Sequence, residues 1–81
     1  MTRNEILKII KNEEMDYYNW YNSQDVYGNQ VCIDISEDKW VVFTTNEKRY
    51  KVTEICFNNE SDVLKEFIKR LRASNRRRNR N

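Results

Sequence analysis

The chain has no histidine, no proline and only one glycine, and it has two cysteines among its 81 residues. Without histidine, the commonest general base and one of the commonest metal ligands are missing. Cys32 and Cys56 are too far apart to form a CxxC zinc or redox motif, and nothing resembles a spaced carboxylate loop for calcium. We therefore expect no cofactor, no bound metal and no enzymatic activity.

Long apolar runs are missing too. No segment approaches the length of about 18 apolar residues that a membrane span requires. The stretch MTRNEILKIIKNEEMD at the start is interrupted by charges, so it does not read as a signal peptide. We expect a cytoplasmic protein whose two thiols are reduced and behave as small, half-buried strand residues, with a disulfide as the alternative.

The length of the chain limits where a functional site can lie. A chain of 81 residues builds one small core, and a domain of this size buries only about 60 to 65% of its unfolded surface. A deep pocket would remove part of the only core available. We therefore expect the function to lie on the surface.

Charge is divided unevenly along the chain. All 13 acidic residues and eight of the 15 basic ones lie within residues 1–68, so this part has a formal charge of −5. The other seven basic residues follow, most of them in the terminal run RLRASNRRRNRN. Because nucleic-acid binders usually spread basic residues over one folded face, we do not expect nucleic acid to be the partner. The run is interpreted as a solvated tail or as a favourable cationic end for a helix.

Two helices are predicted, one toward each end of the chain. Thr2 and Glu5 form a capping box, and the isoleucines that follow recur at helical spacing, which predicts a helix over residues 3–13. The stretch NNESD supplies N-cap residues and first-turn acids for a second helix over residues 61–73. The apolar stripe of this second helix consists of Val63, Leu64, Phe67, Ile68 and Leu71.

Three strands are predicted between the helices. Residues 30–35 alternate with a period of two, residues 40–45 (WVVFTT) are apolar on both faces as in a central strand, and residues 50–57 follow. The polar turns SEDK and NEKR separate them. The apolar phase shifts between Val52 and Ile55, which indicates a β-bulge or contacts on both faces.

These elements predict a small α+β fold in a single domain, residues 1–73: a helix, a three-stranded antiparallel β-meander and a second helix. A fourth short strand is an alternative, because the turn at Gly28 and Asn29 suits a hairpin. Both helices must cover one face of the sheet, which leaves the other face partly open. Residues 74–81 contain nothing apolar, so we predict a frayed, flexible, solvated basic tail.

Two groups of residues are candidates for partner binding. Aromatic residues gather between residues 17 and 27, in a segment that either extends the first helix or forms a loop, and acidic residues lie in or beside the strands. Tyrosine and tryptophan supply many binding hot spots, and an acidic patch steers a basic partner. Ordinary packing and solvated turns are the alternatives. The candidate contact residues are Tyr17, Trp20, Tyr21, Tyr27, Asp34, Glu37, Asp38, Glu47 and Glu54.

The second half of the chain resembles a known class of proteins. Residues 39–43 (KWVVF), 46–49 (NEKR) and 57–62 (FNNESD) occupy places that match the small immunity proteins of bacterial polymorphic-toxin and contact-dependent growth inhibition systems. In those proteins a strand of the type KWVVYY precedes a turn with glutamate and arginine, and an acid-rich segment begins the last helix. The resemblance covers roughly residues 30–72, and the Arg-rich end departs from it.

The resemblance implies a non-catalytic inhibitor that binds one cognate toxin, often a nuclease, and blocks its active site or its access to substrate. An acidic body fits the capture of a basic nuclease domain, and one face of this chain can supply the necessary interface of about 800 Å² per partner. The alternatives are a small phage or bacterial nucleic-acid-binding regulator that uses the basic run, and an acidic phage inhibitor of a host nuclease. The oligomeric state stays open, because a free sheet edge pairs with a partner strand or with a second copy.

Overall fold

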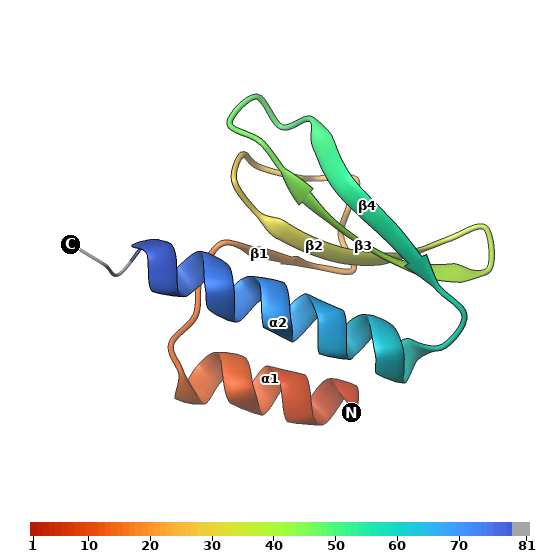
Figure 1. Ribbon diagram of the computed structural model, residues 1–81, viewed down its shortest axis with the longest axis horizontal. Coiled ribbons are helices and arrows are strands. Elements are labelled where there is room, and N and C mark those ends of the chain that lie inside the picture. Colours follow the sequence, from red (N-terminus) through yellow and green to blue (C-terminus); the bar gives the residue numbers. More distant parts are fainter. Residues whose placement is uncertain (79–81) are drawn as a thin grey trace.

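The computed structural model describes residues 1–78. The strands form one four-stranded sheet in the order β1-β2-β3-β4, and both helices lie together on one side of it (Figure 1). The predicted α+β class is therefore confirmed, but the sheet is mixed and has a fourth strand in place of a three-stranded antiparallel meander. The elements in chain order are α1 (Arg3–Asn12), β1 (Tyr18–Trp20), β2 (Val31–Ser36), β3 (Lys39–Thr45), β4 (Lys51–Phe57) and α2 (Glu60–Arg78).

Side-chain caps begin both helices where the sequence predicts them. Thr2 accepts a hydrogen bond from the backbone N–H of Glu5, and the Glu5 side chain accepts one from the backbone of Thr2, which completes the capping box of α1. Asn59 Oδ1 accepts a hydrogen bond from the backbone N–H of Asp62 at 2.9 Å at the start of α2. Each cap satisfies amide groups that have no partner within the first turn.

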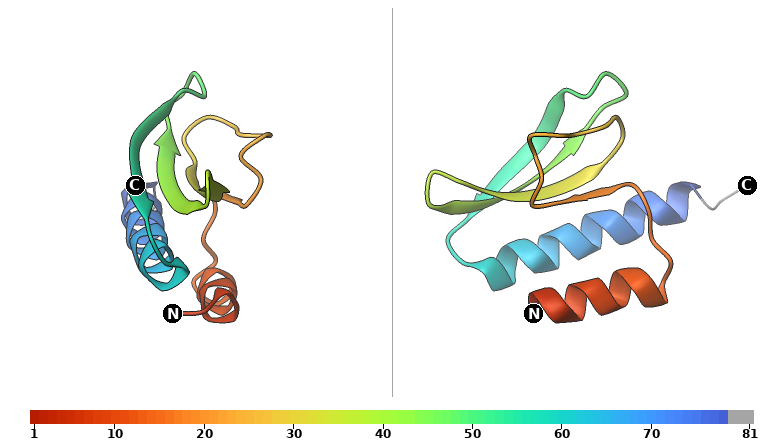
Figure 2. Two further views of the ribbon diagram at one scale, coloured as in Figure 1. Left: turned by 90° about the vertical axis from the view of Figure 1, so that its right-hand side faces the viewer. Right: turned by 180° about the vertical axis from the view of Figure 1, so that it is seen from behind.

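The fourth strand comes from the aromatic segment, and it does not belong to a hairpin. β1 pairs with β2 in parallel, with Tyr18 opposite Val31 and Trp20 opposite Ile33. Parallel neighbours cannot be joined by a tight turn, so residues 21–30 form a wide loop on the side of the sheet away from the helices (Figure 2). The turn at Gly28 packs against the β3–β4 connection instead.

Gly28 is required by that contact. A Cβ atom at this position would lie 2.9 Å from the backbone carbonyl oxygen of Glu47 and 3.3 Å from that of Asn46. Such a separation from backbone oxygen is too short for a carbon atom, so any side chain would push the two connections apart. The single glycine therefore holds the wide loop against the sheet.

The main core lies between the helices and the sheet. The predicted stripes of both helices are buried there, and Val42 of β3 contributes from the sheet. The sequence periodicity identified these positions correctly, because burying one face requires a regular repeat of apolar residues. The buried members are Ile6, Ile10, Met15, Val31, Ile33, Val42, Val63, Leu64, Phe67, Ile68 and Leu71.

A smaller cluster occupies part of the opposite face of the sheet. Cys32, Val41 and Phe43 form it, and Val26 of the wide loop packs against it. Burial raises the pKa of the Cys32 thiol to about 12, so this side chain stays protonated at neutral pH and packs as a small apolar group. Cys56 is exposed on β4, and both cysteines are free thiols in strands.

The predicted β-bulge in β4 is confirmed. Val42 pairs with Ile55 and Thr44 pairs with Val52, so the single residue between them on β3 faces two residues on β4. One of the two is Thr53, whose φ of 52° is rare for a β-branched residue. The bulge turns the Thr53 carbonyl toward α2, where Arg70 donates a hydrogen bond to it at 2.8 Å.

α2 does not end near residue 73. It continues to Arg78, so the prediction of a frayed tail is wrong for residues 74–78, which are helical. The rest of that predicted tail, residues 79–81, lies outside the described residues. Neither described helix has the length and apolarity that crossing a membrane demands.

Polar contacts with the segment after α1, and not apolar packing, fix the position of this helical extension. The Asn75 side chain accepts a hydrogen bond from the Asp16 backbone N–H at 2.9 Å and donates one to the Asp16 carbonyl at 3.0 Å. Arg72 donates two hydrogen bonds to the Glu13 carboxylate, at 3.1 and 2.6 Å. These partners lie 59 positions apart in the sequence, which explains why no local pattern predicts the extension.

Candidate functional site

The aromatic candidates divide into two exposed and two partly buried side chains. Trp20 and Tyr21 pack against the main core, and the Trp20 ring centroid lies 5.7 Å from that of Phe67. Tyr17 and Tyr27 are 48% and 56% exposed. The structure therefore leaves Tyr17 and Tyr27 as the accessible pair, while Trp20 and Tyr21 contribute to packing.

Tyr21 links the beginnings of the two helices. Its hydroxyl donates a hydrogen bond to Glu60 Oε2 at 2.7 Å, and the Arg3 guanidinium pairs with the same oxygen at 2.6 Å. The hydrogen bond from Tyr21, followed by that from Arg3, lowers the pKa of the Glu60 carboxyl. Burial, followed by the hydrogen bond to this carboxylate, raises the pKa of the Tyr21 hydroxyl. Both shifts come from a structural contact that holds the helices and β1 together.

The acidic candidates do not form one patch. Glu37 and Asp38 are the two central residues of the tight β2–β3 turn, with positive φ values of 51° and 65°. Glu47 lies in the β3–β4 turn at the opposite end of β3. Asp34 and Glu54 lie on the face of the sheet away from the helices, and Glu54 pairs with Lys51 at 3.1 Å.

Asp34 is used mainly to anchor the wide loop. Its carboxylate accepts hydrogen bonds from the backbone N–H and the hydroxyl of Ser23, and from the backbone N–H of Ile35. Burial alone would raise the pKa of Asp34, but these hydrogen bonds and the charge of Lys51 outweigh it and lower the pKa. The carboxylate is therefore ionised and already occupied within the fold.

β4 is the open edge of the sheet. It is seven residues long, and its residues from Lys51 to Cys56 are all exposed. Tyr50, Val52 and Ile55 are large apolar residues exposed along it. An edge strand presents unpaired N–H and C=O groups that can pair with another chain. The sequence signal for this surface is the shifted apolar phase of KVTEICF, because the bulge brings Val52 and Ile55, the partners of Thr44 and Val42, to the same face.

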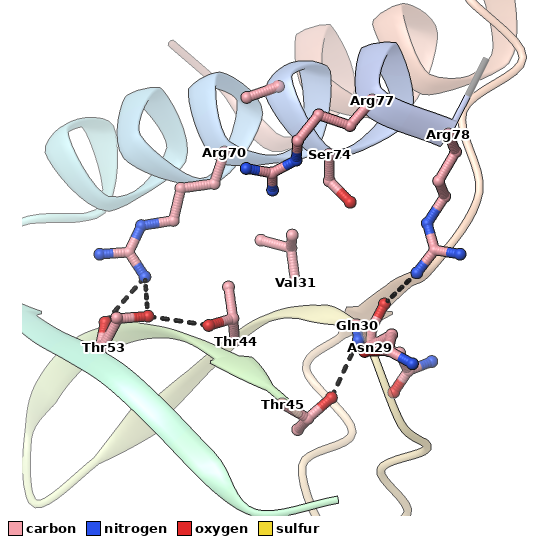
Figure 3. A pocket seen from close by; sticks show the side chains of 11 residues that line it. Asn29, Gln30, Val31, Thr44, Thr45, Thr53, Arg70, Ser74, Arg77 and Arg78 are labelled. Carbon is pink, nitrogen blue, oxygen red and sulfur yellow. Dashed lines mark hydrogen bonds between the residues drawn. The ribbon is translucent and has the colours of Figure 1, made fainter. Parts of the chain in front are cut away.

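A pocket of about 670 Å³ opens between the second half of α2 and the sheet (Figure 3). Arginines, hydroxyls and amides dominate its lining, and no carboxylate is among the lining residues. Arg70, Ser74 and Arg77 share one helical face only because α2 continues to Arg78, so the sequence prediction, which ends the helix at residue 73, does not identify the pocket. The lining residues are Asn29, Gln30, Val31, Thr44, Thr45, Thr53, Arg70, Ala73, Ser74, Arg77 and Arg78.

Comparison with known proteins gives no match to a protein-family model, to a curated protein or to a solved structure. Within residues 1–78, no group of three histidine, cysteine, aspartate or glutamate side chains is placed to hold a metal ion. The function is therefore argued from the surfaces of this chain, of which the β4 edge and the arginine-lined pocket are the most distinctive.

Proposed function

We propose that this protein is a non-catalytic, immunity-type inhibitor that binds a cognate bacterial toxin in the cytoplasm and covers its active site or substrate-binding surface. The observation that carries the proposal is the open β4 edge with large apolar side chains exposed along it. The resemblance over residues 30–72 and the formal charge of −5 on residues 1–68 support the same class.

The toxin pairs a strand of its own with β4 and extends the sheet. In this mode of recognition, main-chain hydrogen bonds supply affinity, and alternate side chains of the edge strand supply specificity. The Thr53 bulge and the ion pair between Lys51 and Glu54 shield the first half of β4. The half that contains Ile55 and Cys56 is regular, so it is the part on which the partner strand lies.

Acidic candidates flank both ends of this edge. Trp40 pairs with Phe57, so the β2–β3 turn with Glu37 and Asp38 lies beside the end of β4. Glu47 lies just before β4 begins. Carboxylates at both ends of a strand attract a basic nuclease domain and fix its orientation, which raises the rate of association.

Co-expression with the product of the neighbouring gene tests the proposal. We expect that product to arrest bacterial growth, and we expect this protein to restore growth and to co-purify with it. The proposal is contradicted if no neighbouring product is toxic, or if this protein neither restores growth nor co-purifies.

Two matched substitutions test whether β4 is the contact surface. Ile55→Lys places a charge at a 44%-exposed position on β4, whereas Leu7→Lys makes the same change at a 42%-exposed position on α1, away from β4 (Figure 1). An interface hot spot is worth about 2 kcal/mol or more, so we expect Ile55→Lys to weaken toxin binding at least about thirtyfold. Leu7→Lys should leave binding unchanged, and equal effects of the two would place the contact elsewhere.

A further inference from the structure

Three arginine side chains of α2 line the pocket between this helix and the sheet. Figure 3 shows Arg70 and Arg78 extending toward opposite ends of the pocket, where they contact Thr53 and Asn29, with Arg77 between them. No carboxylate is among the described lining residues, so the guanidinium charges give the pocket a positive potential.

Two of the three arginines are fixed by contacts within the fold. Arg70 is only 15% exposed, and it donates to Glu66 at 2.8 Å and to the Thr53 carbonyl at 2.8 Å. Arg78 donates to the Asn29 carbonyl at 3.0 Å, and its guanidinium carbon lies 3.5 Å from the centroid of the Tyr17 ring. Such contacts orient the remaining N–H groups before any ligand arrives, which reduces the entropy lost on binding.

Arg77 differs from its neighbours. Among residues 1–78 it has no hydrogen-bond or ion-pair partner, although it lines the pocket. All its donors are therefore available to a ligand. Since Arg77 makes no contact of this kind, it can be substituted without loss of a stabilising contact.

Neutral polar groups face these arginines from the sheet and from the helix. The hydroxyls of Thr44 and Thr53 lie 2.8 Å apart, and that of Thr53 donates to the Val52 carbonyl at 2.7 Å, so both are bonded within the fold. Ser74 contributes a further hydroxyl from α2. The amide side chain of Asn29 also lines the opening. Hydroxyl and amide groups complement guanidinium groups around an oxyanion, because each supplies a hydrogen bond to an oxygen that the arginines do not reach.

We propose that this pocket binds the phosphate group of a small phosphomonoester ligand. Guanidinium forks match the geometry of phosphate oxygens, and a phosphate dianion is attracted to a positive pocket more strongly than a singly charged carboxylate is. The volume of about 670 Å³ leaves room for the group that carries the phosphate, since small-molecule sites generally occupy about 300 to 1,000 Å³.

A terminal phosphate fits this site better than the backbone of a nucleic acid. A polynucleotide gains affinity by contacting successive phosphates along a basic track. Residues 1–68 offer no such track, because their formal charge is −5. Arg70, Arg77 and Arg78 line the pocket, whereas Arg72 and Arg76 lie outside it beside Glu13, so the basic residues of α2 do not form one continuous track.

Titration of the full-length, ¹⁵N-labelled protein with inorganic phosphate and with a 5′-mononucleotide tests the proposal by NMR. We expect saturable shifts confined to residues 29–31, 44–45, 53 and 70–78. Tighter binding of the mononucleotide identifies a ligand that carries a nucleoside, and equal binding identifies the free phosphate group as the ligand. Absence of saturable binding, or shifts spread over all surface arginines, overturns the proposal.

Two neighbouring arginines provide a matched control. Arg77→Gln removes a charge inside the pocket, and Arg76→Gln removes the same charge beside Glu13 and Met15, outside it. Losing a charge-assisted hydrogen bond weakens binding about tenfold or more. We expect that loss for Arg77→Gln and less than a twofold change for Arg76→Gln, with unchanged thermal melting for both.

A titration with a single-stranded oligonucleotide that has no terminal phosphate tests whether the arginines bind the backbone phosphates of nucleic acid instead. If it binds more tightly than the mononucleotide, with a steep salt dependence and with equal losses in the two variants, the arginines bind nucleic acid nonspecifically and the proposal is wrong. This outcome is independent of toxin binding at β4, because neither Ile55 nor Val52 lines the pocket.

Discussion

The two halves of α2 are held to the rest of the protein by different forces. From Glu60 to Leu71 the helix buries an apolar stripe that includes Phe67 and Leu71, each with no exposed surface. From Arg72 to Arg78 it buries nothing apolar and is held by one ion pair and by hydrogen bonds to the segment that follows α1 and to Asn29 of the wide loop. One helix therefore combines a structural half with a half whose charged side chains are available for binding.

The difference shows how a small domain can build a charged site without weakening its core. Apolar burial is nonspecific and strong, so it supplies most of the stability of the first half. Polar contacts are individually weaker, but they are directional, and they fix the angle at which arginines leave the helix. Four substitutions or conditions, from the largest expected effect to the smallest, test this division.

Truncating the apolar half should cost the most stability. Phe67 is fully buried and contacts Trp20, so Phe67→Ala leaves a cavity in the main core. Such changes cost about 3 to 5 kcal/mol, a large part of the total stability of a small domain. Urea unfolding followed by circular dichroism measures the loss. Phe67→Leu, which keeps most of the volume, should cost clearly less, and equal losses would mean that cavity formation is not the cause.

Removing the central polar contact of the second half should cost less. Asn75→Ala deletes the two hydrogen bonds to the Asp16 backbone and the one to the Leu71 carbonyl. We expect a loss of about 1 to 2 kcal/mol in the same unfolding measurement, with lower helix content. Lys69→Ala, an exposed position on the same helix, should change stability by less than about 0.5 kcal/mol. A loss as large as that of Phe67→Ala would contradict the division between the halves.

The same division explains which parts of the fold the sequence predicts. The stripe from Val63 to Leu71 repeats every three to four residues, so its helix and its buried face follow from the pattern alone. Asn75 and Asp16 lie 59 positions apart, and nothing local to either residue marks their contact. β1 cannot be predicted from the local sequence for the same reason, since its three residues become a strand only by pairing with β2.

The candidate sites also differ in how far the sequence alone predicts them. Exposed residues such as Tyr27 and Glu37 are found by composition, because aromatic and acidic side chains are recognisable wherever they lie. The pocket depends on the helical continuation through Ser74 and on the bulge that turns Thr53 toward α2. Neither follows from residue type, so the arginines of this pocket look in the sequence like part of a solvated tail.

Thr53 is the point where β4 meets Arg70 of α2, and relieving the strain of its backbone should stabilise the protein slightly. Its φ of 52° is unfavourable for a β-branched residue and natural for glycine. We expect Thr53→Gly to raise the free energy of unfolding by up to about 1 kcal/mol. Thr44→Gly, the same substitution on the neighbouring strand β3, should lower it by about 1 kcal/mol. A loss of stability in both variants would show that the Thr53 side chain outweighs the strain.

Mild acid should loosen the charged half before the apolar half. The hydrogen bond from Arg72 lowers the pKa of the Glu13 carboxyl, burial opposes it, and the charges of Arg72 and Arg76 add to the lowering. Because this pKa is lower in the folded protein than in the unfolded chain, the contact stabilises fully above the ordinary carboxyl range and is lost as pH falls through the folded value. Carbon chemical shifts of residues 72–78 should therefore move toward coil values in acid while those of residues 63–71 stay helical. In Glu13→Gln, which cannot titrate, the shifts of residues 72–78 should no longer change over that pH range. If both halves lose helicity in one step, α2 is a single cooperative unit whose charged end depends on the core.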